Sequence, residues 1–259
     1  MNVNRWTWVA ARSIGTSHIR ARKGCDDFGA CLEVTGSADT VLVAVASDGA
    51  GSACRSAIGS WITTRVFVQS AIEHVRQGHD LKSFSIDLAK EWIDDIRDRI
   101  GAAAARAAAL PRDFAATLVG CLIGNESSVF IHVGDGASVF RRRGEPNWNV
   151  PTWPAQYAAT TFFVTDEPEP NLQFAMVTGS IEEVAVFSDG LEKLVLEFST
   201  RRAFSPFFEK MFMPLRDSPP GRNRTLSRVL RDFLDGPSVC EKTDDDKTLI
   251  LAKRHLEHR

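Results

Sequence analysis

The chain has 259 residues, of which 44% are hydrophobic and 25% are charged. This composition is typical of a soluble globular protein with one large core, and we expect a single domain over residues 1–259. The formal net charge of −2 gives no global attraction to nucleic acid or to an anionic membrane, so neither is an expected partner.

The cysteines and the N-terminus indicate the compartment. Five cysteines, an odd number, are scattered without the paired spacing of zinc sites. The apolar segment within residues 1–13 is too short for a signal peptide, and no stretch approaches the roughly 20 apolar residues of a membrane span. We therefore expect a cytoplasmic protein.

The opening of the chain is predicted to form strands and then a helix. Strand-like runs lie at about 5–12, 28–34 and 40–47, bounded by turn-rich stretches. A helix is expected over about 52–77, ended by Gly78. Apolar residues recur along it at helical spacing and predict the face that contacts the core: Cys54, Ile58, Trp61, Ile62 and Val66.

The central part is predicted to contain a second helix and a meander of strands. The helix is expected from about 80 to 110, where Pro111 ends it. Its apolar side is predicted to consist of Leu88, Trp92, Ile93, Ile96 and Ile100. Three strands follow at about 117–123, 128–133 and 137–142, joined by glycine-containing turns.

Residues 144–180 contain five prolines together with several aromatic residues. Because proline interrupts regular structure, we expect a loop-rich flap there. The rest of the chain is predicted to contain, in order, a strand, three helices and a last strand at about 183–187, 190–197, 204–213, 222–234 and 247–253. Blocks of strands with helices grouped between them favour an α+β fold over regular alternation.

Aspartates beside strand-like runs are the most informative feature of the sequence. Asp48, Asp135 and Asp189 each follow an apolar run, and Asp245 comes just before one. If these strands pair in a common core, the carboxylates meet at its rim, where they repel unless a cation neutralises them. Hard divalent cations with oxygen ligands do this most simply, so the sequence predicts a two-metal hydrolytic site.

A competing interpretation of these aspartates is a set of ordinary turns. Asp48, Asp135 and Asp189 are each followed by glycine, and Asp-Gly after a strand is a common hairpin turn. The whole set favours a site, because independent turns need not all follow apolar strands. Independent turns also do not explain the additional acidic pair at 26–27 and the acidic triplet at 244–246.

Two further residues near the acidic positions are candidates. Arg22 lies four residues before Asp26, and a guanidinium can hold a phosphate through two parallel hydrogen bonds. Gly49 lets the backbone come close, so its carbonyl is a candidate metal ligand beside the Asp48 carboxylate. The sequence has no GxSxG elbow and no cysteine in a phosphate-cradling glycine loop, so no nucleophilic side chain is indicated.

Two histidines lie close to these motifs. His132 is inside an apolar strand and is interpreted as a hydrogen-bonded structural residue. His18 precedes Arg22 in a polar stretch and is a weaker candidate for contact with a substrate phosphate.

The motifs together resemble the metal-dependent, type 2C (PPM) protein serine/threonine phosphatases, and within them the compact bacterial branch. The resemblance runs from about Ser13 to Lys253. The stretch Gln156–Asp166 is similar to a segment of the bacterial branch. The matching motifs, in family order, are Arg22-x-x-x-Asp26-Asp27, Ser47-Asp48-Gly49-Ala50-Gly51-Ser52, Ala116-Thr117-Leu118-Val119-Gly120, Val133-Gly134-Asp135-Gly136, Phe187-Ser188-Asp189-Gly190-Leu191 and Asp245-Asp246-Lys247-Thr248.

The resemblance implies a fold and a set of metal ligands. The implied fold is a central β-sandwich of two antiparallel sheets flanked by helices on both sides, a four-layer αββα arrangement. Asp48 would bridge two Mn²⁺ or Mg²⁺ ions, with the Gly49 carbonyl on one ion and Asp189 and Asp245 on the other. Asp135, together with Asp189, would suit a third and weaker metal.

The resemblance also implies an activity and partners. The activity is hydrolysis of phosphoserine and phosphothreonine in proteins by a hydroxide that bridges the two metal ions. Asp26 and Asp27 would hold metal-bound waters, and Arg22 would bind the substrate phosphate. The implied partners are a phosphorylated protein substrate and a cognate serine/threonine kinase, and we expect a monomer.

Departures from the commoner family pattern leave an alternative open. Ala50 stands where some eukaryotic members carry a histidine, Asp26 replaces a glutamate, and Gly136-Ala137 replaces Ser-Arg. The alternative is a non-catalytic phosphatase-like fold that binds a phosphoprotein or partner, although Asp48, Asp189 and Asp245 are retained. A nuclease is disfavoured, because no basic stripe with stacking aromatic residues surrounds the acids.

Overall fold

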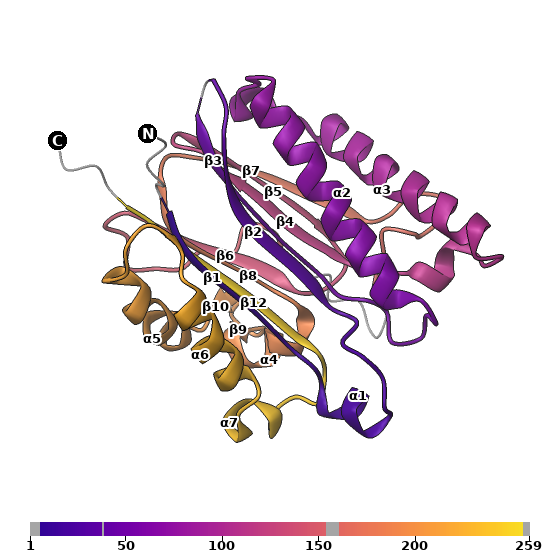
Figure 1. Ribbon diagram of the computed structural model, residues 1–259. Helices are drawn as coiled ribbons and strands as arrows, with labels where there is room; N and C mark the ends of the chain where they lie inside the picture. The colour runs from indigo at the N-terminus through magenta and orange to yellow at the C-terminus, as the bar shows by residue number, and fades with distance from the viewer. Residues whose placement is uncertain (1–5, 38, 154–160, 256–259) are drawn as a thin grey trace.

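In the computed structural model, the described residues are 6–37, 39–153 and 161–255. They form two five-stranded sheets that face each other, with helices on both outer faces (Figure 1). The predicted α+β fold, a β-sandwich flanked by helices, is confirmed.

The first sheet has the strand order β2-β3-β4-β5-β7, and all neighbouring strands are antiparallel. Its strands are β2 (Phe28–Thr35), β3 (Thr40–Ser47), β4 (Leu118–Ile123), β5 (Ser127–Val133) and β7 (Leu172–Thr178). β3, β4 and β5 are buried along almost their whole length. Their continuous apolar runs suit central strands that have a layer on each face.

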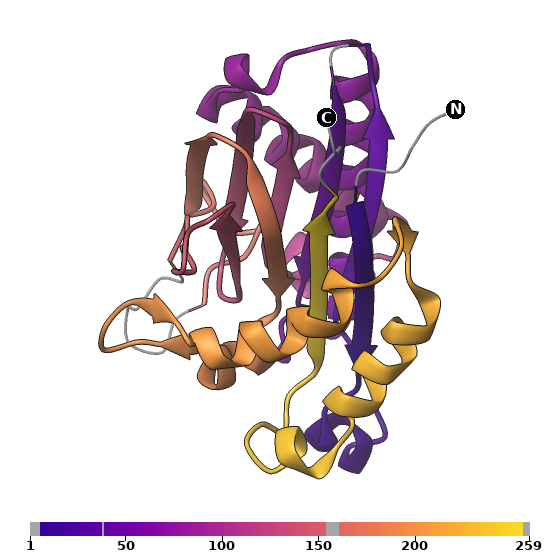
Figure 2. The same ribbon diagram turned by 90° about the vertical axis from the view of Figure 1, so that its left-hand side faces the viewer.

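The second sheet has the strand order β11-β1-β12-β8-β6. Its strands are β1 (Trp6–Ser13), β6 (Ala137–Arg142), β8 (Ile181–Phe187), β11 (Gly221–Arg222) and β12 (Lys247–Arg254). The pairs are antiparallel except for the short β1–β11 pair, which is parallel. The first and last strands of the chain therefore lie side by side inside one sheet (Figure 2).

Helices α2 (Ser56–Arg76) and α3 (Ile86–Arg106) cover the first sheet (Figure 1). Two short 3-10 helices, η1 (Leu81–Ser83) and η2 (Pro111–Phe114), flank α3. The predicted side of α3 is confirmed for Trp92 and the three isoleucines, which are buried. The helix ends at Arg106, before the predicted end, and Ala108 has a φ of 49°.

The predicted inner face of α2 is confirmed for Ile62 and Val66, which pack in the core, and is wrong for the other predicted residues. Ile58 and Trp61 are each 44% exposed, and the helix begins at Ser56 rather than near Ser52. Small residues form much of the inner face instead, and a Cβ atom on Gly59 would lie 1.9 Å from the Phe114 carbonyl oxygen. Glycine and serine are small enough to allow this close approach. Because they are not apolar, a search for apolar residues at helical spacing could not identify them as the inner face.

Helices α5 (Ser205–Arg216) and α6 (Arg224–Leu234) cover the second sheet (Figure 2). The short elements α1 (Thr16–Arg20) and α7 (Pro237–Cys240) lie together at one end of the sandwich in both views. The remaining elements after β8 are η3 (Asp189–Leu191), α4 (Glu192–Val195) and the hairpin β9 (Leu196–Glu197) with β10 (Arg202–Ala203). None of the helices in the described ranges combines the length and apolar character required to cross a bilayer.

Among the described residues of the segment 144–180, one stretch forms a regular element. Residues 172–178, predicted as part of the loop-rich flap, form β7, which pairs with β5 at the edge of the first sheet. The prolines of the segment all precede this strand and leave its backbone donors intact. Residues 154–160, which include the first part of the Gln156–Asp166 motif, lie outside the described residues.

Three clusters of buried apolar residues hold the layers together. One lies between the first sheet and α2 with α3, one between the two sheets, and one between the second sheet and α5 with α6. Each large apolar side chain that is fully buried contributes about 1.5–3 kcal/mol relative to its exposed state. The ends of the central strands are therefore fixed in position from both sides.

Candidate metal centre

Three carboxylates from distant parts of the chain meet at one end of the sandwich. Asp48 follows β3, Asp135 follows β5, and Asp189 follows β8 at the start of η3. One oxygen atom of each lies within 4.8 Å of the others. Because β3 and β5 belong to the first sheet and β8 to the second, the packing of the two sheets brings these carboxylates together.

Burial and mutual repulsion disfavour the charged form of these groups. The pKa of Asp48 is raised well above its usual value by burial and by the charges of Asp27 and Asp189. The pKa of Asp189 is raised in the same way by burial and by Asp135 and Asp245, and burial also raises the pKa of Asp135. Anions held this closely are stable only when a cation or protons compensate their charge.

The oxygen atoms of the cluster fit a hard divalent cation. Oδ1 of Asp135 and Oδ1 of Asp189 are buried and accept no hydrogen bond from any described residue. A buried carboxylate oxygen without a donor is costly unless it binds a cation or water. The three ligand candidates are all aspartates, and a set of oxygen ligands favours Mg²⁺ or Mn²⁺ over softer metals.

Asp245 lies beside this group of three. Its charge contributes to the raised pKa of Asp48, Asp135 and Asp189, and it lines the same pocket as Asp189. Its Oδ1 accepts a hydrogen bond from the backbone N–H of Asp246 at 2.9 Å. The carboxylate oxygens that lie within 4.8 Å of one another belong to Asp48, Asp135 and Asp189. The resemblance implied Asp245 as a ligand of the two main ions and Asp135 as a ligand of a third ion, so the observed group differs from the expected one.

Asp26 and Asp27 stand directly before β2 and point in different directions. Asp27 is fully buried, its Oδ2 accepts a hydrogen bond from Ser188 Oγ at 2.7 Å, and burial raises its pKa to about 6. The carboxylate of Asp26 instead accepts a hydrogen bond from Ser56 Oγ of α2 at 2.9 Å. Asp27 therefore faces the cluster beside Asp48, whereas Asp26 joins the β2 end to α2.

Gly49 and Arg22 have distinctive backbone positions. The backbone of Asp48, next to Gly49, is fixed by Thr117, whose N–H donates to the Asp48 carbonyl at 2.8 Å. A Cβ atom on Gly49 would lie 2.7 Å from the Ser56 carbonyl carbon, so a larger residue does not fit. Arg22 is exposed and has a φ of 56°, in the left-handed region.

The family model of protein phosphatase 2C matches residues 14–235. The chain belongs to the protein phosphatase 2C family. The matched range contains Asp48, Asp135 and Asp189 and ends before Asp245. The resemblance that the sequence motifs indicate is therefore confirmed.

Individual relatives agree with the family assignment. Serine/threonine-protein phosphatase 3 of Escherichia coli strain K12 is 32% identical over 251 residues, which cover 95% of this chain and 98% of the relative. Serine/threonine phosphatase Stp1 from Staphylococcus aureus matches 96% of this chain and 95% of its own, with a TM-score of 0.60 and 16% identity. PppA, described as a key regulatory component of T6SS in Pseudomonas aeruginosa, matches 98% and 99%, with a TM-score of 0.65 and 14% identity. The two structures share the fold.

In this protein phosphatase 2C chain, two residues that the sequence analysis missed hold the Asp135 loop. Glu192 Oε1 accepts a hydrogen bond from the Gly136 N–H at 2.6 Å, and Thr161 Oγ1 donates one to Asp135 Oδ2 at 2.7 Å. Burial and the charge of Asp135 raise the pKa of Glu192 to about 8. The position of Glu192 three residues after Asp189 was a usable signal, because that spacing places both on one turn. Thr161 lies inside the Gln156–Asp166 stretch that resembles the bacterial branch, but that resemblance gave the residue no role.

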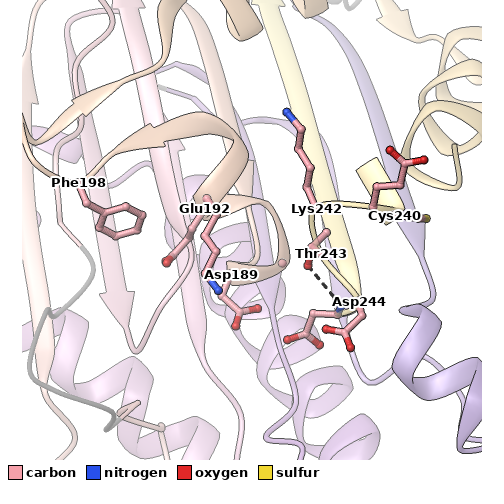
Figure 3. A pocket seen from close by; sticks show the side chains of 11 residues that line it. Asp189, Glu192, Phe198, Cys240, Lys242, Thr243 and Asp244 are labelled. Carbon is pink, nitrogen blue, oxygen red and sulfur yellow. Dashed lines mark hydrogen bonds between the residues drawn. The ribbon is translucent and has the colours of Figure 1, made fainter. Parts of the chain in front are cut away.

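A pocket of about 500 Å³ opens beside Asp189 and Asp245. Figure 3 shows Glu192 and Phe198 near Asp189 on one side, and Cys240, Lys242, Thr243 and Asp244 on the other. The walls come from the segments that follow β8 and precede β12. The pocket therefore lies between these two segments and reaches Asp189 and Asp245.

Proposed function

We propose that this protein is a metal-dependent phosphatase that hydrolyses phosphoserine and phosphothreonine in a partner protein. The observation that carries the proposal is the buried cluster of Asp48, Asp135 and Asp189, which has carboxylate oxygens without hydrogen-bond donors among the described residues. Membership of the protein phosphatase 2C family supports the same activity. A non-catalytic binder has no need of such a cluster, so this alternative is the weaker one.

We assign the cluster to two Mn²⁺ or Mg²⁺ ions, with a third and weaker site. The ligands in this assignment are Asp48, Asp135, Asp189, Asp245 and the carbonyl of Gly49. Bound ions of this kind supply Lewis acidity, which lowers the pKa of water and neutralises charge on the transferring phosphoryl group. The protein holds the ligands rigidly because three of them end strands of the two packed sheets.

Asp27, Asp26 and Arg22 complete the proposed site. Ser188 holds one carboxylate oxygen of Asp27, so that the other can accept a hydrogen bond from water and orient it beside Asp48. The carboxylate of Asp26 accepts a hydrogen bond from Ser56 of α2. In this proposal, Asp26 therefore contributes by fixing the start of β2 and, with it, the neighbouring Asp27. The exposed guanidinium of Arg22 binds the non-bridging oxygens of the substrate phosphate.

The substrate is a phosphorylated protein segment that enters by the pocket beside Asp189. Lys193 and Lys242 line this pocket and offset part of its acidic charge. A cognate serine/threonine kinase supplies the phosphorylated form, and the protein acts as a monomer. All five cysteines are free, which supports a reducing cytoplasm as the compartment.

The test is phosphopeptide hydrolysis by wild type and Asp189→Asn. We expect turnover by wild type with Mn²⁺, loss of turnover in chelator, and a fall of about 10³-fold in kcat/KM for the variant. Circular dichroism serves as the control that the variant is folded. If folded wild-type protein shows no turnover with Mn²⁺ or Mg²⁺ but binds the phosphopeptide, the non-catalytic alternative is correct.

A further inference from the structure

Asp246, next to Asp245, is a buried anion that holds the segment before β2. It is 1% exposed and accepts hydrogen bonds from the backbone N–H of Gly15 at 2.6 Å and of Asp26 at 2.5 Å. Nδ1 of His18 lies 3.0 Å from its Oδ2. Because an ionised carboxylate only accepts, this ring nitrogen is the donor. Both ends of the segment 15–26 thus meet on a single carboxylate.

The end of α1 places Arg22 in an unusual conformation. The Lys23 N–H donates to the His18 carbonyl at 2.9 Å, and the Arg22 N–H donates to the Ile19 carbonyl at 3.1 Å. These two bonds form the Schellman motif, in which glycine usually occupies the left-handed position that Arg22 has here, with a φ of 56°. This conformation is uncommon for a residue other than glycine, and among the described residues Arg22 shares it with Ala108 and Arg201.

His18 joins these two features. Its side chain is bonded to Asp246, and its carbonyl closes the turn that sets the backbone at Arg22. We name residues 15–23 the phosphate arm. We propose that His18 and Asp246 are positioning residues that hold the phosphate arm, and with it Arg22, at the metal centre. This inference rests on the proposed function of the site and adds a connection between its metal-binding and phosphate-binding parts.

Neighbouring contacts distinguish this pair from ordinary surface bonding. Ser17 also bonds to the 244–246 segment, through its N–H and Oγ to the Asp244 carbonyl at 2.9 and 2.6 Å. The ion pair between Arg20 and Asp244 has side chains that are 69% and 66% exposed, so water and salt screen it. The His18–Asp246 pair, at 13% and 1% exposed, is shielded from both. Arg20 therefore offers a matched control on the same helix.

The consequence for catalysis is a defined kinetic signature. Without the His18 side chain, the phosphate arm samples orientations in which Arg22 points away from the phosphate. Substrate binding then weakens while the ligands on the strands stay in place. We expect His18→Ala to raise KM for a phosphopeptide about tenfold and to change kcat less than twofold.

The deciding experiment is a double-mutant cycle of His18→Ala and Arg22→Ala, measured with Mn²⁺ and a phosphopeptide. If His18 acts through Arg22, the double variant has the same KM as Arg22→Ala alone. His18→Asn, which keeps a donor near the position of Nδ1, should restore most of the affinity. Arg20→Ala should leave KM and kcat within twofold of wild type.

The inference is wrong if the two effects on KM multiply, or if His18→Ala lowers Tm while KM stays unchanged. Amide hydrogen exchange over the phosphate arm gives a second readout that needs no turnover. We expect exchange about fivefold faster or more in His18→Ala and unchanged in Arg20→Ala. Unchanged exchange in His18→Ala would overturn the inference even if wild type is an active phosphatase. Inactivity of wild type, by contrast, would count against the proposed function alone.

Discussion

The metal centre and the phosphate arm hold unfavourable energy in two different forms. At the metal centre the strain is electrostatic, because buried carboxylates with raised pKa values face one another at the ends of packed strands. In the phosphate arm the strain is conformational, because Arg22 occupies a position that favours glycine. A bound cation would relieve the electrostatic strain, and replacement of Arg22 by glycine would relieve the conformational strain. The two regions can therefore be perturbed separately.

The largest effect is expected from a change at the metal centre itself. Asp48→Asn removes one charge from the cluster and weakens ion binding, so kcat/KM should fall by about 10³-fold. The variant should also melt at a higher temperature than wild type in chelator, because one repelling charge is gone. Steady-state kinetics and thermal melting together check this. A lower Tm in chelator would show that Asp48 has no electrostatic strain to relieve.

A smaller effect is expected from Glu192, whose pKa rises from 4.5 to about 8. Since the folded pKa is above the unfolded one, the stability linked to this group is full below pH 4.5 and is lost as the pH rises to about 8. Glu192→Gln removes the titration, and its side-chain oxygen can still accept the Gly136 N–H. In chelator, the variant should gain roughly 2–4 °C in Tm at pH 8 and less at pH 5. An equal gain at both pH values would contradict the assigned cause.

The smallest effect is expected from glycine at position 22. Arg22→Gly should raise the free energy of unfolding by roughly 1 kcal/mol relative to Arg22→Ala, because only glycine adopts a positive φ without strain. Both variants should bind phosphopeptide equally weakly, since both lack the guanidinium. Denaturant unfolding and KM measurements on the pair separate the two effects. Equal stability of the two variants would mean that the arm is not strained at this residue.

The fold and the acidic cluster could be predicted from the sequence because both depend on the strands. The apolar runs mark the strands, and the aspartates stand at the ends of those runs. Apolar runs of four or more residues located most of the strands, and the aspartates beside them converge as expected for Asp48, Asp135 and Asp189. Much of the inner face of α2 could not be found this way, because glycine and serine produce that contact. The strand β7 was hidden by the prolines that come before it.

The side-chain contacts around the site were less accessible to sequence reasoning. Asp246 belonged to a recognised motif, but its bonds to Gly15, His18 and Asp26 depend on segments more than two hundred positions away in the chain. The sequence made His18 a candidate for phosphate contact, and its bond to Asp246 through Nδ1 could not be predicted from that position. Contacts of this kind depend on the packed structure, and no local spacing encodes them.

The pairing of β1 with β12 has a consequence for the order in which this protein matures during synthesis. β12 lies between β1 and β8 in the second sheet, so the native sheet cannot close before β12 has been translated. Asp245 and Asp246 emerge from the ribosome just ahead of that strand. A nascent chain that still lacks β12 therefore has an open sheet, and dephosphorylation can begin only after this strand has docked.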